Sequence, residues 1–295
     1  MRGSLPGNTI PLETEQIRVR KEITVDPGEM QYLMDRSFVC PVCGKKFNSK
    51  CVNNSKTVLE GWDVDLRPRY KGIDVSKYRV AECHYCGYAG IARYDSKIDE
   101  REKAAYKESG LKSLGVSNKN EGLRSYREAY DGYRAALRCY IINNARHSVR
   151  GLTALYTAWL LRGWREALEK EGETVEVNDA MSLLAETRLL RYALYNFKKS
   201  EMEESDALSD LGENVLDYII AALHYMRGEY QTAEAYLRGV INSTEVRLRL
   251  FKQAKELRRL IRTSRRLDRQ ERLDRQEGQD RQEKNKKKIH GREKK

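Results

Sequence analysis

The spacing of apolar residues changes once along this chain, near Ser96. Up to that point, apolar and polar residues alternate in short runs such as residues 17–25, which is typical of β-strands. Asp26-Pro27-Gly28 marks a turn. Beyond Ser96, apolar residues recur every three or four positions, as in helices that bury one face. The pattern therefore predicts an α+β protein, with a small β-rich module followed by an all-α helical array.

Several stretches after Ser96 carry the helical spacing strongly enough to predict faces that point into a core. Two acidic breaks, at residues 169–179 and 201–213, are expected to be loops. The predicted helical stripes lie in residues 126–144, 152–160, 179–200, 213–226 and 246–261.

The segment from Gly228 to Val240 is more specific than the other stripes. It resembles the turn and second helix of a tetratricopeptide repeat (TPR), in which Ala233 lets two helices approach closely while Leu237 and Val240 face the next helix. Only one copy is clear, whereas a stable array needs about three repeat units. The other helices are therefore expected to form degenerate TPR-like hairpins or a plain bundle.

The charge of the chain is concentrated at its C-terminal end. Residues 245–295 hold 20 Lys and Arg against 9 Asp and Glu, which accounts for +11 of the net +12 carried by all 295 residues. The motif RLDRQE occurs twice from Arg266 and is followed by GQDRQE. A six-residue repeat cannot hold one helical face because 3.6 does not divide six. We expect a disordered basic tail or a charged helix continuing from Leu260. The high isoelectric point thus describes an appendage and is weak evidence for nucleic-acid binding.

These patterns divide the chain into four parts. They are a flexible arm (1–16), a zinc-ribbon-like module (17–95), a TPR-like α-helical domain (96–262) and a basic low-complexity tail (263–295). The longest uncharged run, residues 151–161, falls short of the ~20 residues of a membrane span, and no apolar signal segment follows Arg2. A cytoplasmic protein without a membrane partner is expected.

Two CxxC-Gly motifs, at residues 40–44 and 83–87, carry the clearest chemistry. Two residues between cysteines allow both sulfurs to reach one ion, and a Gly after the second Cys suits the tight turn of a knuckle. The motifs predict one structural Zn²⁺ ion held by Cys40, Cys43, Cys83 and Cys86, with iron as the chemical alternative. Paired redox motifs of the thioredoxin type are disfavoured because neither pair lies near a βαβ pattern.

The neighbouring candidates are expected to be structural. His84 lies inside the second knuckle and should point away from a site that four cysteines complete. Cys51 and Cys139 are expected to pack as small apolar residues, with Cys51 as a fallback ligand. His147 and His224 are expected to satisfy structural contacts.

The segment between the knuckles is dense in charge and aromatic rings. Asp63, Asp65, Arg67 and Arg69 lie between Trp62 and Tyr70. Ion pairing that fixes the insertion is favoured over a recognition patch for protein or nucleic acid. An acid/base role for the two aspartates ranks last, because no supporting His, Ser or Cys constellation accompanies them.

Three segments together resemble DUF2225, a domain-of-unknown-function family of uncharacterised bacterial proteins. They are a CPxCG knuckle (40–44), a D-x-D-[FL]-x-x-x-Y-x-G segment (63–72) and an aromatic-x-V-x-x-C-x-x-C-G-Y-A knuckle (78–89). The resemblance covers roughly residues 35–262 and implies the metal site and a helical, repeat-like C-terminal half. The chain departs from the pattern in its N-terminal arm, in His84 where Pro is common, and in its repetitive tail. The resemblance implies no established function.

Two functions follow as hypotheses. The first is a non-enzymatic zinc-binding adaptor whose helical repeats present a surface to a protein or peptide partner. The alternative is an RNA- or DNA-associated zinc-ribbon protein that uses its basic C-terminal helix and tail. An enzyme is not expected, since a closed four-cysteine site leaves no open coordination position on the metal.

Overall fold

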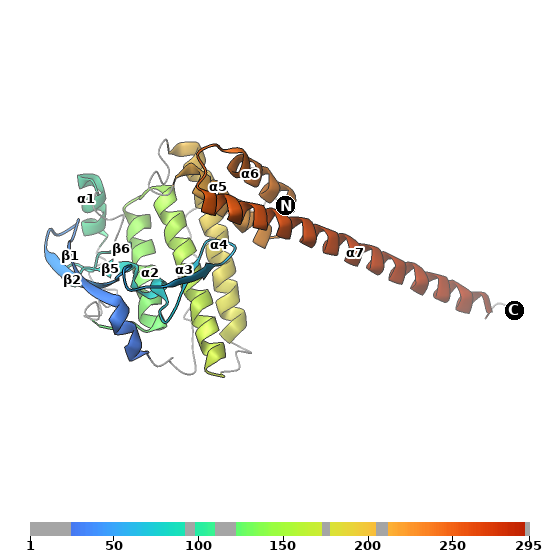
Figure 1. The fold of residues 1–295 in the computed structure, drawn as a ribbon, viewed down its shortest axis with the longest axis horizontal. Helices are drawn as coiled ribbons and strands as arrows, with labels where there is room; N and C mark the ends of the chain where they lie inside the picture. Colours follow the sequence, from blue (N-terminus) through green and yellow to red (C-terminus); the bar gives the residue numbers. More distant parts are fainter. Residues whose placement is uncertain (1–24, 92–97, 110–121, 173–177, 205–211, 293–295) are drawn as a thin grey trace. The chain divides into compact units, whose positions relative to one another are not determined.

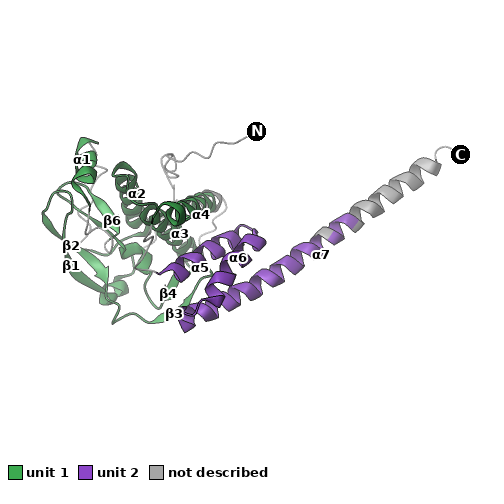
Figure 2. Ribbon diagram, turned by 90° about the horizontal axis from the view of Figure 1, so that it is seen from above, with its two compact units in different colours: residues 1–210 green, residues 211–295 purple. Residues whose placement is uncertain are grey.

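The computed structural model describes residues 25–91, 98–109, 122–172, 178–204 and 212–292. The chain forms two compact units, Met1–Asp210 and Leu211–Lys295 (Figure 2). The predicted N-terminal arm and most of the first predicted strand lie outside the described residues. The predicted boundary between ribbon module and helices, at residue 95, lies inside the first unit.

Within the described residues, the β-rich part of the first unit contains three two-stranded antiparallel sheets. The pairs are β1 (Leu33–Val39) with β2 (Lys46–Val52), β3 (Leu59–Trp62) with β4 (Pro68–Tyr70), and β5 (Val80–Glu82) with β6 (Ala89–Ile91). A short 3₁₀ helix, η1 (Pro27–Tyr32), precedes β1, and a second, η2 (Val75–Tyr78), connects β4 to β5. Each is capped by a preceding aspartate. The predicted turn at Asp26 is thus the start of η1. There the Asp26 carboxylate accepts a hydrogen bond from the Gly28 N–H.

Four α-helices are described in the first unit, and the last three of them coincide with predicted apolar stripes. They are α1 (Glu100–Glu108), α2 (Tyr126–Ile142), α3 (His147–Lys170) and α4 (Asn178–Glu203). A capping box of Ser125 and Glu128 begins α2, because each side chain accepts a hydrogen bond from the other residue's backbone N–H. Close contact of α3 with α4 requires Gly151, where a Cβ atom would lie 2.8 Å from the Phe197 ring.

The third sheet packs directly on α2 (Figure 1). The Ile91 N–H donates to the Tyr140 hydroxyl at 2.7 Å, and the Tyr133 hydroxyl donates to the Ser76 carbonyl at 2.9 Å. The buried Arg124 guanidinium donates to the Val80 carbonyl at 2.6 Å. The β-rich module and α2 therefore share one core, instead of folding as separate domains.

The second unit contains α5 (Glu213–Met226), α6 (Tyr230–Asn242) and α7 (Leu248–Arg292). Gly228 adopts a φ of +75° in the turn between α5 and α6, and Ala233, Leu237 and Val240 are fully buried. The segment singled out as TPR-like is thus a helical hairpin in which the three named residues are buried, while membership of a repeat class stays a prediction. Of the two states expected for the tail, the structure has the helical one as far as Arg292.

None of the described helices combines the length and the apolar character that crossing a membrane requires.

Candidate metal centre

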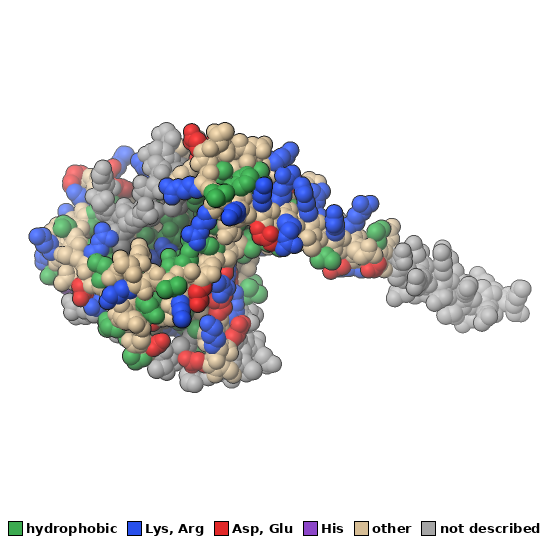
Figure 3. Space-filling view, viewed as in Figure 1, with side chains coloured by type: hydrophobic (Ala, Val, Ile, Leu, Met, Phe, Trp, Pro, Cys, Tyr) green, Lys and Arg blue, Asp and Glu red, His purple; other side chains and the backbone are tan. Residues whose placement is uncertain are grey.

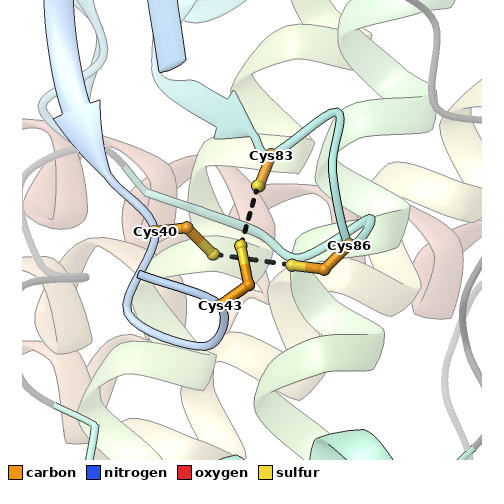
Figure 4. A group of neighbouring side chains, drawn as sticks. All are labelled: Cys40, Cys43, Cys83 and Cys86. Carbon is orange, nitrogen blue, oxygen red and sulfur yellow. Dashed lines mark hydrogen bonds between the residues drawn. The ribbon is translucent and has the colours of Figure 1, made fainter. Parts of the chain in front are cut away.

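Four cysteine sulfurs converge in the first unit (Figure 4). The Sγ atoms of Cys40, Cys43, Cys83 and Cys86 all lie within 4.8 Å of one another. Cys40 lies 3.5 Å from Cys86, and Cys43 lies 3.7 Å from Cys83, so each knuckle contacts the other. The structure brings together the four residues that the sequence assigned to the metal.

The two knuckles are built by the same backbone turns. Gly44 and Gly87 have φ of +72° and +76°, a conformation that costs little without a Cβ atom. The N–H of each glycine donates to the carbonyl of the first cysteine, Cys40 or Cys83, at 2.9 and 2.8 Å. The Cys40 N–H donates to the Lys45 carbonyl at 3.0 Å, and the Cys83 N–H donates to the Tyr88 carbonyl at 2.8 Å. The CxxCG spacing therefore sets the direction of both thiols locally.

The spacing of the sulfurs suits a tetrahedral ion. Sulfurs bound at ~2.3 Å from a tetrahedral centre are ~3.8 Å apart, close to the two shortest distances seen here. Without a cation the cluster disfavours thiolates: the Cys86 hydrogen bond and burial raise the pKa of Cys40, and burial raises the pKa of Cys83 to about 11. A divalent cation would reverse this balance, because it stabilises the deprotonated ligand. The four residues thus fit a metal ion whose identity the geometry leaves between zinc and iron.

The residues around the cluster are structural. His84 is exposed and is not part of the cluster of ligand atoms, and the centroid of its ring lies 4.1 Å from that of the Tyr85 ring. Cys139 is buried on α2, where the Ala89 N–H approaches its sulfur at 3.5 Å, and Cys51 lies on β2 outside the cluster. Helix α1 also reaches the site, because the Tyr106 hydroxyl donates to the Cys86 carbonyl at 3.0 Å.

The charged segment between the knuckles forms a buried ion-pair network with α3 and α4. Asp65 is fully buried and accepts two hydrogen bonds from Arg162 at 2.9 and 3.0 Å. Arg67, 5% exposed, donates to both carboxylate oxygens of Glu166 at 3.0 and 3.1 Å. Arg162 also contacts Glu186 of α4 at 2.8 Å. Ion pairing that fixes the insertion is therefore what the structure shows for these residues.

Asp63 and Arg69 complete the network at its edge. They pair with each other, and Asp63 also accepts from Arg162 at 3.1 Å, while Arg69 donates to Glu166 at 2.8 Å. Burial raises the pKa of Asp63, but hydrogen bonds from Arg69 and Arg162 outweigh it and hold that pKa below its ordinary value. Asp63 is thus poorly suited to accept a proton near neutral pH.

A glycine allows the network to form. Gly163 of α3 faces Asp74 and Arg67, and a Cβ atom there would lie 2.0 Å from the Asp74 carboxylate. Arg67 approaches that carboxylate at 3.6 Å. The segment between the two knuckles therefore packs directly against the α3 backbone at Gly163, where no side chain intervenes.

Sequence reasoning missed the helical half of this network. Arg162 and Glu166 follow the predicted stripe 152–160, Glu186 lies within the stripe 179–200, and all three resemble ordinary solvent-facing charges. One signal was available in the sequence. Arg162 and Glu166 are four residues apart, so they lie on one face of the helix, and the neighbouring Gly163 has no side chain to fill the space beside them. The partners of Arg162 and Glu166 in the insertion lie 97 to 99 residues earlier, so no local pattern identifies them.

Comparison with known proteins gives one match. A family model described as "Uncharacterized protein conserved in bacteria (DUF2225)" matches residues 33–261. The matched segment contains both knuckles, the ion-pair network and helices α1–α6, and the resemblance drawn from the sequence is confirmed. No curated protein and no solved structure matched the chain.

Proposed function

Since the chain belongs to DUF2225, a family of uncharacterized proteins conserved in bacteria, we propose from its own geometry that it is a non-enzymatic zinc-binding adaptor. In this proposal one Zn²⁺ ion, held by the four cysteines, fixes the β-rich module against α2 and α3. The helical surfaces then bind a protein or peptide partner. The thiols would stay reduced in a cytoplasmic location.

The observation that carries the proposal is the closed set of four thiols. Four protein sulfurs fill a tetrahedral coordination sphere, so a metal here has no position left for substrate or activated water. The carboxylates nearest to an acid/base pair, Asp63 and Asp65, are committed to Arg69 and Arg162. Both features favour a structural part that presents a surface over a catalytic one.

The metal assignment is tested by elemental analysis of the purified full-length protein. One zinc per chain is expected. Reconstitution with Co²⁺ should give the visible d–d and thiolate charge-transfer bands of a tetrahedral four-sulfur site. Iron in place of zinc would correct the identity of the metal but keep the four-cysteine site. Less than one equivalent of metal together with free thiols would contradict the site itself.

The adaptor role is tested by partner capture. Full-length protein is used as bait after nuclease treatment, and an equal amount of chelator-treated bait serves as the control. Specific proteins retained only by the metal-loaded bait would support the proposal. Recovery of no protein partner at any salt concentration would contradict it, as would a turnover activity lost in an Asp63→Asn, Asp65→Asn double variant that still folds and binds metal.

A further inference from the structure

The second unit contains a basic groove that the adaptor proposal does not use. It has a volume of about 680 Å³ and lies between the first turn of α6 and the middle of α7. Its main lining residues are Tyr230 and Thr232 from α6 with Arg262, Arg265, Arg266 and Arg269 from α7. Figure 3 shows Lys and Arg side chains gathered along one edge of α7.

Most of the remaining charge around the groove is already paired. Arg265 contacts Glu234 of α6 at 3.2 Å, and Glu229 at the rim is engaged by His224 and Arg227. Among the residues that the structure describes, Arg262, Arg266 and Arg269 form no ion pair, and all three are exposed. Asp268, half-buried beside Tyr230, is the one lining carboxylate for which no ion pair is described. Three guanidiniums against one carboxylate leave a net positive groove.

The three unpaired arginines form one stripe. Their positions i, i+4 and i+7 place them on the same face of α7, at axial intervals of about 6 and 4.5 Å. Like charges at this spacing repel one another and destabilise a helix. Within the described part of the chain no acidic side chain pairs with them, unlike Arg258 and Arg265, which both contact Glu234. A ligand with regularly spaced negative charges would supply that compensation.

We propose that this groove binds the phosphate backbone of a single-stranded nucleic acid. Guanidinium groups bind phosphate through two parallel hydrogen bonds, which favours phosphate over scattered carboxylates. The half-buried Tyr230 ring in the opposite wall offers a surface on which an unpaired base can stack. A duplex hides its base faces and could not use that ring, so the single strand is favoured.

The test measures binding of a fluorescein-labelled twelve-nucleotide uridine RNA to the full-length protein by fluorescence anisotropy. The groove variant changes Arg262, Arg266 and Arg269 to Gln. The matched control changes Lys252, Arg259 and Arg275 to Gln, removing the same three charges from positions on α7 outside the groove lining. Circular dichroism checks that both variants keep the helical content of the parent.

The groove variant should bind at least tenfold more weakly than the parent, and the control within about twofold. The slope of log K against log salt should become shallower by about 2 in the groove variant, because single strands give a slope of ≈ −0.7 for each phosphate contacted. Tyr230→Leu should weaken binding about tenfold with an unchanged salt slope, as base stacking predicts.

Equal weakening of RNA binding in both triple variants would overturn the proposal. It would show that the charges of α7 attract RNA without specificity for the groove. So would tighter binding of a ten-residue polyglutamate peptide than of the RNA at the same groove, or a duplex bound as tightly as the single strand. These outcomes are independent of protein capture after nuclease treatment, so the groove and the adaptor proposal fail separately.

Discussion

Each cysteine of the cluster depends on the other three. The sulfurs crowd together, and their burial and mutual hydrogen bonds raise the pKa of Cys40 and Cys83. Such a group is stable as thiolates only around a cation. Cys51 lies on β2, which pairs with β1, and its sulfur is not part of the cluster. The two kinds of cysteine can therefore be distinguished by mutation.

Cys83→Ser should abolish stoichiometric metal binding, whereas Cys51→Ser should retain it. Structural zinc contributes ~10–16 kcal/mol to folding, so a variant that no longer holds the metal should lose most of the stability of the first unit. Elemental analysis and urea denaturation of both variants measure this. Full metal content in Cys83→Ser, or its loss in Cys51→Ser, would show that Cys51 serves as a ligand.

Gly163 gives a second prediction at the scale of one residue. Gly163→Ala inserts a Cβ atom 2.0 Å from the Asp74 carboxylate. Overpacking of this kind costs about 1–3 kcal/mol, so the urea midpoint of the first unit should fall. Gly239→Ala is the matched control within a helix, because its nearest heavy atom lies 3.7 Å away. The control should gain about 0.5–1 kcal/mol, the usual effect of replacing a helical glycine. A neutral Gly163→Ala would mean that the insertion can move away from α3.

The sequence predicts single residues well where the chemistry is local. A CxxCG motif specifies its own turn, so all four metal candidates could be predicted from spacing. Asp65 and Arg67 were recognised as charged and dense, but their partners Arg162 and Glu166 were not. Pairing across nearly a hundred residues depends on how the insertion packs on α3, which no local pattern encodes.

At the scale of elements, the network fastens the insertion between the knuckles to α3 and α4. Arg162 is its centre, since it contacts Asp63, Asp65 and Glu186. Arg69 lies at the edge, with its side chain 47% exposed. Because desolvated charges depend on their partners far more than exposed ones do, the two arginines should differ sharply when removed.

Arg162→Leu should destabilise the first unit by about 3–5 kcal/mol, because it removes the cation paired with the fully buried Asp65. Glu186 keeps its contact with Arg165 at 2.7 Å. Arg69→Leu should cost less than about 1 kcal/mol, since that pair is screened by solvent. Urea denaturation followed by tryptophan fluorescence measures both, because Trp164 lies on α3. Equal effects would mean that the buried carboxylates find other partners.

The same elements predict how stability depends on pH. Burial raises the pKa of Asp63 and Glu166, but hydrogen bonds from arginines outweigh it and hold both below their ordinary values of 3.8 and 4.5. The unfolded chain then takes up protons first on acidification, so this contribution is present above the ordinary values and is lost as the pH falls below them. Denaturation midpoints from pH 6 to pH 3 should fall in the parent and fall less in Asp63→Asn.

Glu82 supplies the opposing control. Burial raises its pKa, so its protonation adds stability as the pH falls, and Glu82→Gln should make the acid decline steeper. A parent whose stability is flat down to pH 3, or a shallower decline in Glu82→Gln, would contradict this assignment of the charges.

The helices from α2 onward followed from the apolar periodicity, whereas their ends were not predicted, although Ser125 caps α2 in the structure. What periodicity could not give is which face meets which neighbour. The stripe on α2 reads as a face for another helix, yet Tyr133 and Tyr140 also bind η2 and β6. Likewise, the i,i+3 and i,i+4 spacing of the α7 arginines was visible, but their position opposite the first turn of α6 was not.

At the scale of the whole molecule, the two compact units meet in sequence at residue 210, not at the compositional change near Ser96. The reason is that β5, β6 and η2 bury their apolar side chains on α2 and α3. From the sequence alone, metal removal is expected to unfold the N-terminal module and leave the helices largely intact. The shared core predicts that the whole first unit, including α2 and α3, loses stability while the second unit stays folded.

Metal removal should therefore reduce hydrogen-exchange protection across the first unit, including α2 and α3, while protection of α5 and α6 stays within about twofold. The reason is that every contact described for the cluster and the ion-pair network lies before Asp210. Amide exchange of the full-length protein, read by mass spectrometry with and without a zinc chelator, separates the helices by peptide. The Cys51→Ser variant treated in the same way controls for effects of the chelator on a thiol. If α2 kept its protection while β1 and β2 lost theirs, the knuckles would be a separate foldable module, and the domain boundary predicted at residue 95 would hold.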